Sequence, residues 1–208
     1  MNQDHIVYRI LDLLGKLIIC SILWVLCALP VITLGASCTA LYYAVVKSIR
    51  RDCSSVLQAF FSAFRENFRQ STVVQILLLW LSAVPVCVLI SAYLTQTPWG
   101  ILQYTMTGVL ILLALVWLLI YPVISRFYHR GGTLLRFLLL LLGRHPLTGL
   151  GSLLMIAGGT LLVLSNGAAL LFVPGVLVYA QSFLLEPVFR KYSTEGENYD
   201  LWYPESNT

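Results

Sequence analysis

Residues that could do chemistry are few in this chain of 208 residues, and their spacing matches no common catalytic or metal-binding pattern. The histidines are His5, His129 and His145, and no acidic residue between Arg126 and Leu185 could orient the last two. The five cysteines include no CxxC pair, which a zinc or thiol-redox site would use. Nucleophile elbows, HExxH motifs and phosphate-binding loops are also absent. We therefore expect no catalytic residue, no metal, no cofactor and no enzymatic activity.

Residues 56–68 have the composition of a segment that could bind a partner. Large apolar side chains recur there at helical spacing, and polar or basic side chains take the other positions. This pattern predicts an amphipathic helix in the membrane interface, with Phe rings at the acyl boundary and Arg head groups among phosphates. Two interpretations stay open: a surface anchor between two spans, or a docking helix, since Phe and Arg are enriched at protein interfaces. The candidate docking residues are Phe60, Phe61, Phe64, Arg65, Phe68 and Arg69.

Residues 30–37 could form an unwound segment within the membrane, and the residues concerned are Pro30, Thr33, Gly35 and Ser37. Pro30 lacks a backbone donor, Gly35 is permissive, and Ser37 is a good helix N-cap. A helix N-terminus exposed there could bind an anionic or hydroxyl-bearing ligand, as in some transporters. The alternative is a compact turn in which the hydroxyl groups of Thr33 and Ser37 satisfy local backbone groups.

The elements that position these segments must lie in a membrane. Apolar residues make up 59% of the chain and charged residues 11%, against about 25% charged residues in soluble domains. A soluble enzyme and a nucleic-acid-binding domain are thereby excluded, so we expect the lipid bilayer and no nucleic acid as a partner. Residues 17–46, 70–125 and 145–185 carry no Asp, Glu, Lys or Arg. Because about 20 apolar residues span a bilayer, the chain is predicted to be an all-α polytopic membrane protein.

We expect six membrane elements, at about residues 6–28, 30–46, 71–94, 101–124, 147–164 and 168–185. They would form a single domain over residues 1–192, followed by a short acidic tail, 193–208. With six crossings, all 13 Lys and Arg residues lie on one side, and the positive-inside rule makes that side the cytoplasm. Both termini would then be cytoplasmic. If residues 30–46 do not cross, five spans remain and the N-terminus is outside.

A weak parallel repeat relates about residues 30–94 to 101–164. Shifting the sequence by 79 residues superimposes like residues: Tyr42 on Tyr121, Lys47 on Arg126 and Arg65 on Arg144. Each half then consists of a membrane helix, a basic corner, an amphipathic segment and a returning helix, and parallel repeats of this type occur in transporters. The second amphipathic segment, residues 134–142, is more apolar than the first, and we expect it to be buried.

Charges deep in the predicted spans are missing. Ion-coupled transporters usually place a carboxylate there, whereas here only Glu186 comes close, at a predicted helix end before Pro187. A small dimeric transporter or channel for a neutral solute is the alternative function. It would need a continuous polar path through the few polar residues of the spans: Gln75, Gln103, Ser152 and Gln181.

Two motifs resemble those of the YesL family of bacterial membrane proteins. They are LPVITLGAS at residues 29–37, followed by ALYY at 40–43, and FFSAFRENFRQS at 60–71. Residues 121–127 resemble the family's second half, and the resemblance covers about residues 10–192. The chain departs from the family at residues 138–142, which are more uniformly apolar.

The resemblance implies a place in carbohydrate uptake. The family's molecular activity is not established, and its members commonly accompany ABC importers of oligosaccharides. A multi-pass accessory protein of the bacterial inner (cytoplasmic) membrane is therefore expected, as a subunit, assembly factor or regulator of a sugar ABC importer. Permease subunits are the expected partner, and a homo-oligomer stays open.

Overall fold

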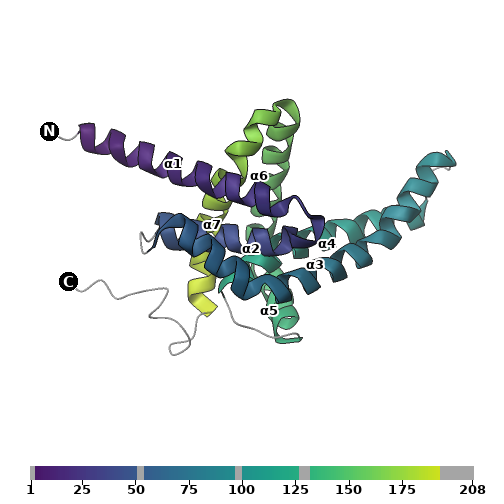
Figure 1. Cartoon of the computed structure of the whole chain (residues 1–208). Coiled ribbons are helices and arrows are strands. Elements are labelled where there is room, and N and C mark those ends of the chain that lie inside the picture. Colours follow the sequence, from purple (N-terminus) through teal and green to yellow (C-terminus); the bar gives the residue numbers. More distant parts are fainter. Residues whose placement is uncertain (1–2, 51–53, 97–99, 127–131, 193–208) are drawn as a thin grey trace.

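The computed structural model describes residues 3–50, 54–96, 100–126 and 132–192, and all regular structure in these residues is helical (Figure 1). Among them, five helical stretches are long and apolar enough to cross a membrane: Val7–Ala28, Val31–Arg50, Val56–Leu94, Ile101–Arg126 and Pro146–Ser165. The prediction of an all-α polytopic membrane protein is confirmed. The predicted acidic tail, 193–208, lies outside the described residues.

The first two helices, α1 (Gln3–Ala28) and α2 (Leu34–Ala44), meet in a tight corner closed by the short turn η1 (Val31–Thr33). The Thr33 hydroxyl donates to the carbonyl oxygens of Cys27 at 2.6 Å and Pro30 at 2.8 Å. The Ser37 hydroxyl donates to the carbonyl oxygen of Trp24 at 3.0 Å. The predicted unwound segment is thus a compact turn whose hydroxyls satisfy nearby carbonyl groups.

Gly35, the remaining small residue of this corner, lies at a close helix contact. A Cβ atom there would lie 2.8 Å from the Ser71 carbonyl oxygen and 2.9 Å from the Tyr121 ring. Only glycine therefore lets α2 approach its neighbours this closely. The residues singled out at 30–37 close a corner and pack helices together.

α2 is prolonged by η2 (Val45–Arg50), a stretch of π-helix, and then the chain turns into α3 (Val56–Leu94). α3 is one helix of 39 residues, so the predicted interfacial helix and the predicted third span are continuous. Its length of about 58 Å exceeds the bilayer hydrocarbon core of about 30 Å. α3 must therefore either tilt strongly as a whole or extend beyond that core at one end.

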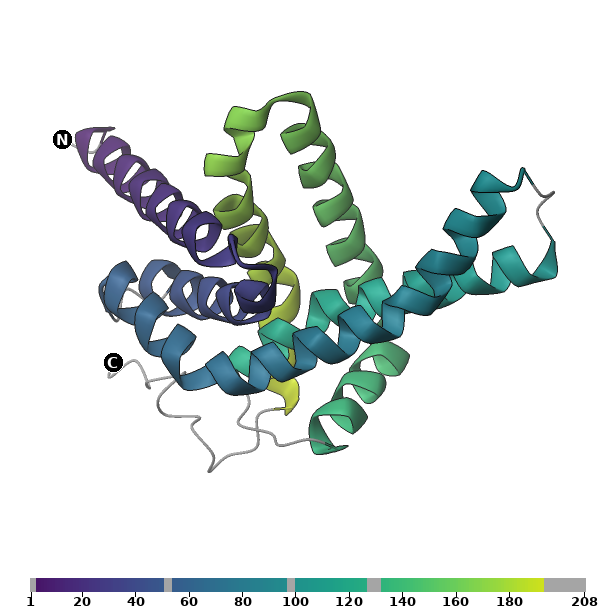
Figure 2. The same ribbon diagram turned by 45° about the vertical axis from the view of Figure 1, so that its right-hand side comes forward.

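The second half begins with α4 (Ile101–Arg126), α5 (Gly132–Arg144) and α6 (Pro146–Ser165). The turn η3 (Gly167–Leu171) and α7 (Val173–Tyr192) complete it. α7 contains most of the sixth predicted element, but it also carries Glu186 and two basic residues and is not among the five apolar spans. The α3–α4 and α6–α7 hairpins project from the centre in different directions (Figure 2).

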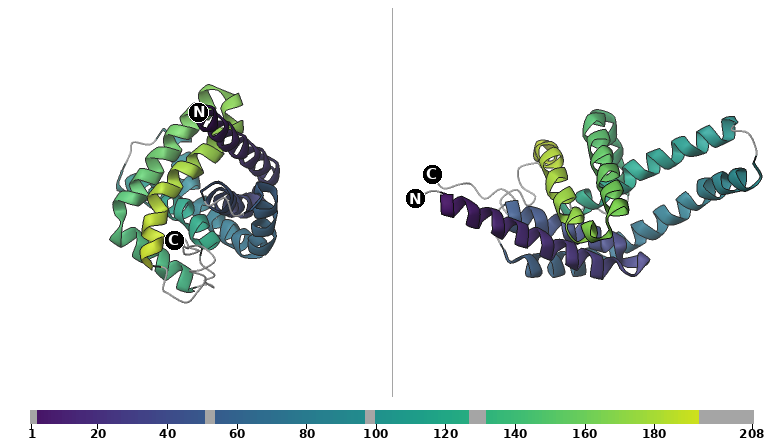
Figure 3. Two further views of the ribbon diagram at one scale, coloured as in Figure 1. Left: turned by 90° about the vertical axis from the view of Figure 1, so that its left-hand side faces the viewer. Right: turned by 90° about the horizontal axis from the view of Figure 1, so that it is seen from above.

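α2 lies at the centre of the helices and takes part in both hydrophobic cores. Seen end-on, it is surrounded by α1, α3, α4 and α7 (Figure 3). The first core joins α2, α4, α5 and α7 around Tyr42, Leu138 and Phe189. The second joins α1, α2, η2 and the start of α3 around Cys20 and Phe60. α2 thus contacts helices of both halves of the chain.

Candidate functional site

The first turns of α3 separate the six predicted docking residues into a buried and an exposed set. Phe60 is fully buried in the second core and is not available to a partner. Phe61 is 52% exposed and Phe68 is 39% exposed. Phe64 is half-buried, and Arg65 and Arg69 are exposed beside these rings.

The spacing of small and large residues explains this division. Val56, Ala59, Phe60 and Ala63 recur at helical spacing and pack against α2. The Phe64 ring lies 5.5 Å from that of Phe68 and continues the aromatic row along the outside. We call this exposed surface the Phe/Arg face; it consists of Leu57, Phe61, Phe64, Arg65, Phe68 and Arg69.

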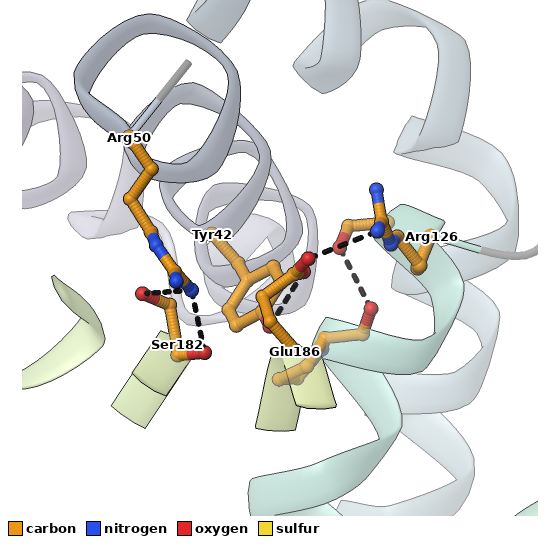
Figure 4. Close-up of polar contacts among 7 residues, drawn as sticks. Tyr42, Arg50, Arg126, Ser182 and Glu186 are labelled. Carbon is orange, nitrogen blue, oxygen red and sulfur yellow. Dashed lines mark hydrogen bonds and ion pairs between the residues drawn. The ribbon is translucent and has the colours of Figure 1, made fainter. Parts of the chain in front are cut away.

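A second candidate site, which is polar, lies inside the protein where α2, α4 and α7 meet (Figure 4). The Arg126 Nη2 atom donates to Glu186 Oε2 at 2.9 Å, and both side chains are buried. The Tyr42 hydroxyl donates to the other carboxylate oxygen at 3.4 Å. We call these three residues the Glu186 cluster.

The Glu186 cluster corrects an expectation from the sequence. Glu186 does not lie at a helix end, because α7 continues through Pro187 to Tyr192 and buries Val188 and Phe189 in the first core. The signal was nevertheless present, since Glu186 is the only acidic residue between Glu66 and Glu195. An isolated carboxylate beside a long apolar run requires a cation when it is buried.

Arg50, at the end of η2, reaches the same helix one turn earlier. Its Nη1 atom donates to the Ser182 carbonyl oxygen at 2.8 Å, and its guanidinium lies 4.4 Å from the centre of the Phe183 ring. Two arginines from separate elements thus hold α7 in place. Both carboxylate oxygens of Glu186 are already hydrogen-bonded within the protein, so the geometry favours a role in holding the helices together over an acid–base role.

The four residues named for a polar path do not bond one another in the described structure. Gln75 accepts hydrogen bonds from Trp117, at 3.0 Å, and from the Tyr121 hydroxyl. Gln103 instead bonds the backbone of Gly100, and it lies about 21 Å along α4 from Trp117. The Ser152 hydroxyl bonds Thr148 within its own helix at 2.8 Å. These three residues have local partners at separate places, whereas Gln181, the fourth, lines an apolar cavity, and its amide Nε2 has no hydrogen-bond acceptor in the described structure.

In the described part of the chain, no three side chains of His, Cys, Asp or Glu could together hold a metal ion. His145 contacts Tyr192, with 3.4 Å between its Nε2 atom and the hydroxyl group. Cys38 accepts a hydrogen bond from the Trp24 indole at 3.4 Å. His145 and Cys38 thus join helices to one another.

One comparison with known proteins gives a match. Residues 17–89 match the family model described as "Protein of unknown function, DUF624". The matched segment includes the corner at residues 30–37, all of α2 and the whole Phe/Arg face. No curated protein and no solved structure matches the chain. The similarity therefore concerns the first half of the chain and carries no activity with it.

Proposed function

We propose that this protein is a non-enzymatic accessory protein of carbohydrate uptake, acting as a subunit, assembly factor or regulator of a sugar ABC importer. The observation that carries the proposal is the Phe/Arg face, an exposed surface continuous with a membrane helix. The link to sugar import rests on the resemblance to the YesL family. The matched segment, residues 17–89, contains both motifs of that resemblance.

The chemistry of the Phe/Arg face suits a protein partner. Phe61, Phe64 and Phe68 follow one another along successive turns, with Arg65 and Arg69 beside them. Aromatic rings and arginines of this kind supply most of the binding energy at many protein interfaces. We propose permease subunits of the importer as the partner.

The position of the face also suits a regulator. The opposite side of the same helical segment packs on α2, and Tyr42 of α2 bonds Glu186 of α7. A partner on the Phe/Arg face would therefore bind a helix that is tied to the centre of the protein. We place the basic ends of the helices, and both termini, on the cytoplasmic side of the bacterial inner membrane, where the ATPase subunits of such importers lie.

Gentle-detergent affinity purification from the native host tests the proposal. The triple variant F61A/R65A/F68A, which spares Phe64 because that ring also packs against the second core, should lose co-purified permease or solute-binding subunits, while its amount in the membrane stays that of the parent. The matched control is V73A/I76A/L77A, which truncates three residues of the same helix that are each about half exposed. The control should retain the partner.

Two results would overturn the proposal. One is unchanged recovery of the importer subunits with the F61A/R65A/F68A variant. The other is recovery of this chain alone, as a homo-oligomer, from a host that is actively importing sugar. A map of tag accessibility at Asn2 and Asn166 tests the proposed orientation, because six crossings place these two residues on opposite sides.

A further inference from the structure

A cavity of about 350 Å³ lies between the α6–α7 hairpin and the helices α1, α2 and α4. This volume falls within the range of small-molecule sites, about 300–1,000 Å³. Its wall is almost entirely apolar, and each helix contributes a large side chain: Trp24, Leu41, Trp117, Val163 and Leu177. A sugar needs many hydrogen-bonding groups, so this wall fits a hydrocarbon ligand instead.

One polar group on the wall is left without a partner by the protein. Gln181 is 4% exposed, and its amide Nε2 has no hydrogen-bond acceptor in the described structure. Other polar side chains of the wall are satisfied: Thr160 bonds Ile156, and Tyr121 bonds Gln75. Because buried amide groups are nearly always bonded, the Gln181 amide marks where a ligand acceptor belongs.

The walls of the cavity are held by close helix contacts. A Cβ atom at Gly159 would lie 2.3 Å from Leu177, so α6 and α7 touch beside the cavity. On the far side of α7, the Gly175 backbone N–H donates to the Ser21 hydroxyl of α1 at 2.9 Å. The cavity is therefore formed before any ligand arrives.

We infer that this cavity binds one acyl chain of a membrane phospholipid, with the Gln181 amide donating to the ester carbonyl of that chain. The residues of α7 that line the cavity run from Val173 to Gln181, about 12 Å along the helix. An extended acyl chain would lie parallel to this row of residues. Gln181 is next to Ser182, where Arg50 binds. The polar end of the site thus lies beside the guanidinium of Arg50, and a basic group suits the head-group boundary of a phospholipid.

This inference does not depend on the Phe/Arg face or on any importer. It assigns the α6–α7 half of the protein to lipid binding, and the two proposals can fail separately. An ether phospholipid has the same chains as an ester phospholipid but no carbonyl group. The pair therefore isolates the hydrogen bond to Gln181 from the burial of the chain.

The test uses the full chain in vesicles of phosphatidylethanolamine and phosphatidylglycerol that contain a phospholipid with a diazirine on one acyl chain. Illumination should label residues of α6 and α7 around the cavity. Ile156→Trp fills the wall and should lower this labelling several-fold, whereas Leu154→Trp, at a 73% exposed position of the same helix, should not. Equal labelling of the two variants would overturn the inference.

Competition between ester and ether phospholipids for the folded parent protein measures the contribution of the hydrogen bond to Gln181. Unlabelled ester phospholipid should displace the probe from the parent protein several-fold better than its ether analogue. In Gln181→Leu the two competitors should become equal, because the donor is gone while the wall is kept. Equal competition already in the parent protein would contradict the assignment of Gln181, and a preference that survives in Gln181→Leu would do the same.

Discussion

The two halves of the chain differ in how an amphipathic segment joins the membrane span that follows it. In the first half, the amphipathic segment and the membrane span form one helix, α3. In the second half, the corresponding stretch is two helices, α5 and α6, separated at His145. α5 buries one face in the first core through Leu134, Leu138 and Leu141, so the expectation of burial is confirmed for that face.

A proline lies at the break between α5 and α6, although α3 and α7 continue through Pro85 and Pro187. Pro146 occupies the first position of α6, and its ring keeps the preceding His145 out of the helical region, at φ −132° and ψ 59°. The shift of 79 residues places Asn67 opposite Pro146, and the Asn67 amide donates to the Ala63 carbonyl at 3.0 Å. Both segments bury one face in a core and expose the other, but only the segment in α3 continues without a break into the membrane span.

The basic corners at Lys47 and Arg126 should show the largest difference between the two halves in their contribution to the free energy of unfolding. Arg126 is buried against Glu186, whereas Lys47, its counterpart at the shift of 79 residues, is half-buried and bonds Tyr43 at 2.7 Å. Arg126→Leu should lower the free energy of unfolding by about 3–5 kcal/mol, because it leaves a buried carboxylate without its cation. Lys47→Leu should lower it by less than about 1 kcal/mol.

Unfolding of the purified protein by SDS in mixed micelles measures both effects. The double variant R126L/E186L should recover much of the lost stability, since no charge is then left buried. Equal stability of the two single leucine variants would show that the corners are equivalent after all.

The buried Phe60 and the exposed Phe61 should show the next largest difference in their contribution to stability. Phe60→Ala should lower the free energy of unfolding by about 3–5 kcal/mol, because a fully buried ring is replaced by a cavity. Phe61→Ala, one residue later and half exposed, should change it by no more than about 0.5 kcal/mol. The same micelle titration compares the two, and similar losses would contradict the burial of Phe60 against α2.

These residues show what could be predicted from the sequence. Apolar runs between charged clusters predict where the helices occur, because membrane burial acts on each segment separately. They do not predict that residues 56–94 form one helix or that α7 extends to Tyr192. The Phe pattern predicts a helix at residues 56–68, but it does not decide which phenylalanine faces the protein, since apolar residues occur on both sides. Contacts between distant segments, such as Arg126 with Glu186, leave only the indirect signal of an isolated charge.

A transplanted proline tests the cause of the difference directly. Asn67→Pro should break α3 where the second half is broken, and it should lower the free energy of unfolding by about 3 kcal/mol or more. Asn67→Ala is the control, because it removes only the bond to Ala63. Limited proteolysis should cut the proline variant near residue 67 and spare the control. Equal resistance of the two variants would mean that the helix is not required to be continuous there.

The reverse change should have the smallest effect. Pro146→Ala should alter the free energy of unfolding by less than about 1 kcal/mol, because the first residue of a helix needs no backbone donor. If the proline alone holds the break, α5 and α6 should join, and backbone amides at residues 144–148 should exchange more slowly with deuterium. If exchange there is unchanged, the buried leucines of α5 hold the break by packing. The second half would then differ from the first through its core residues, and the proline would only mark the place.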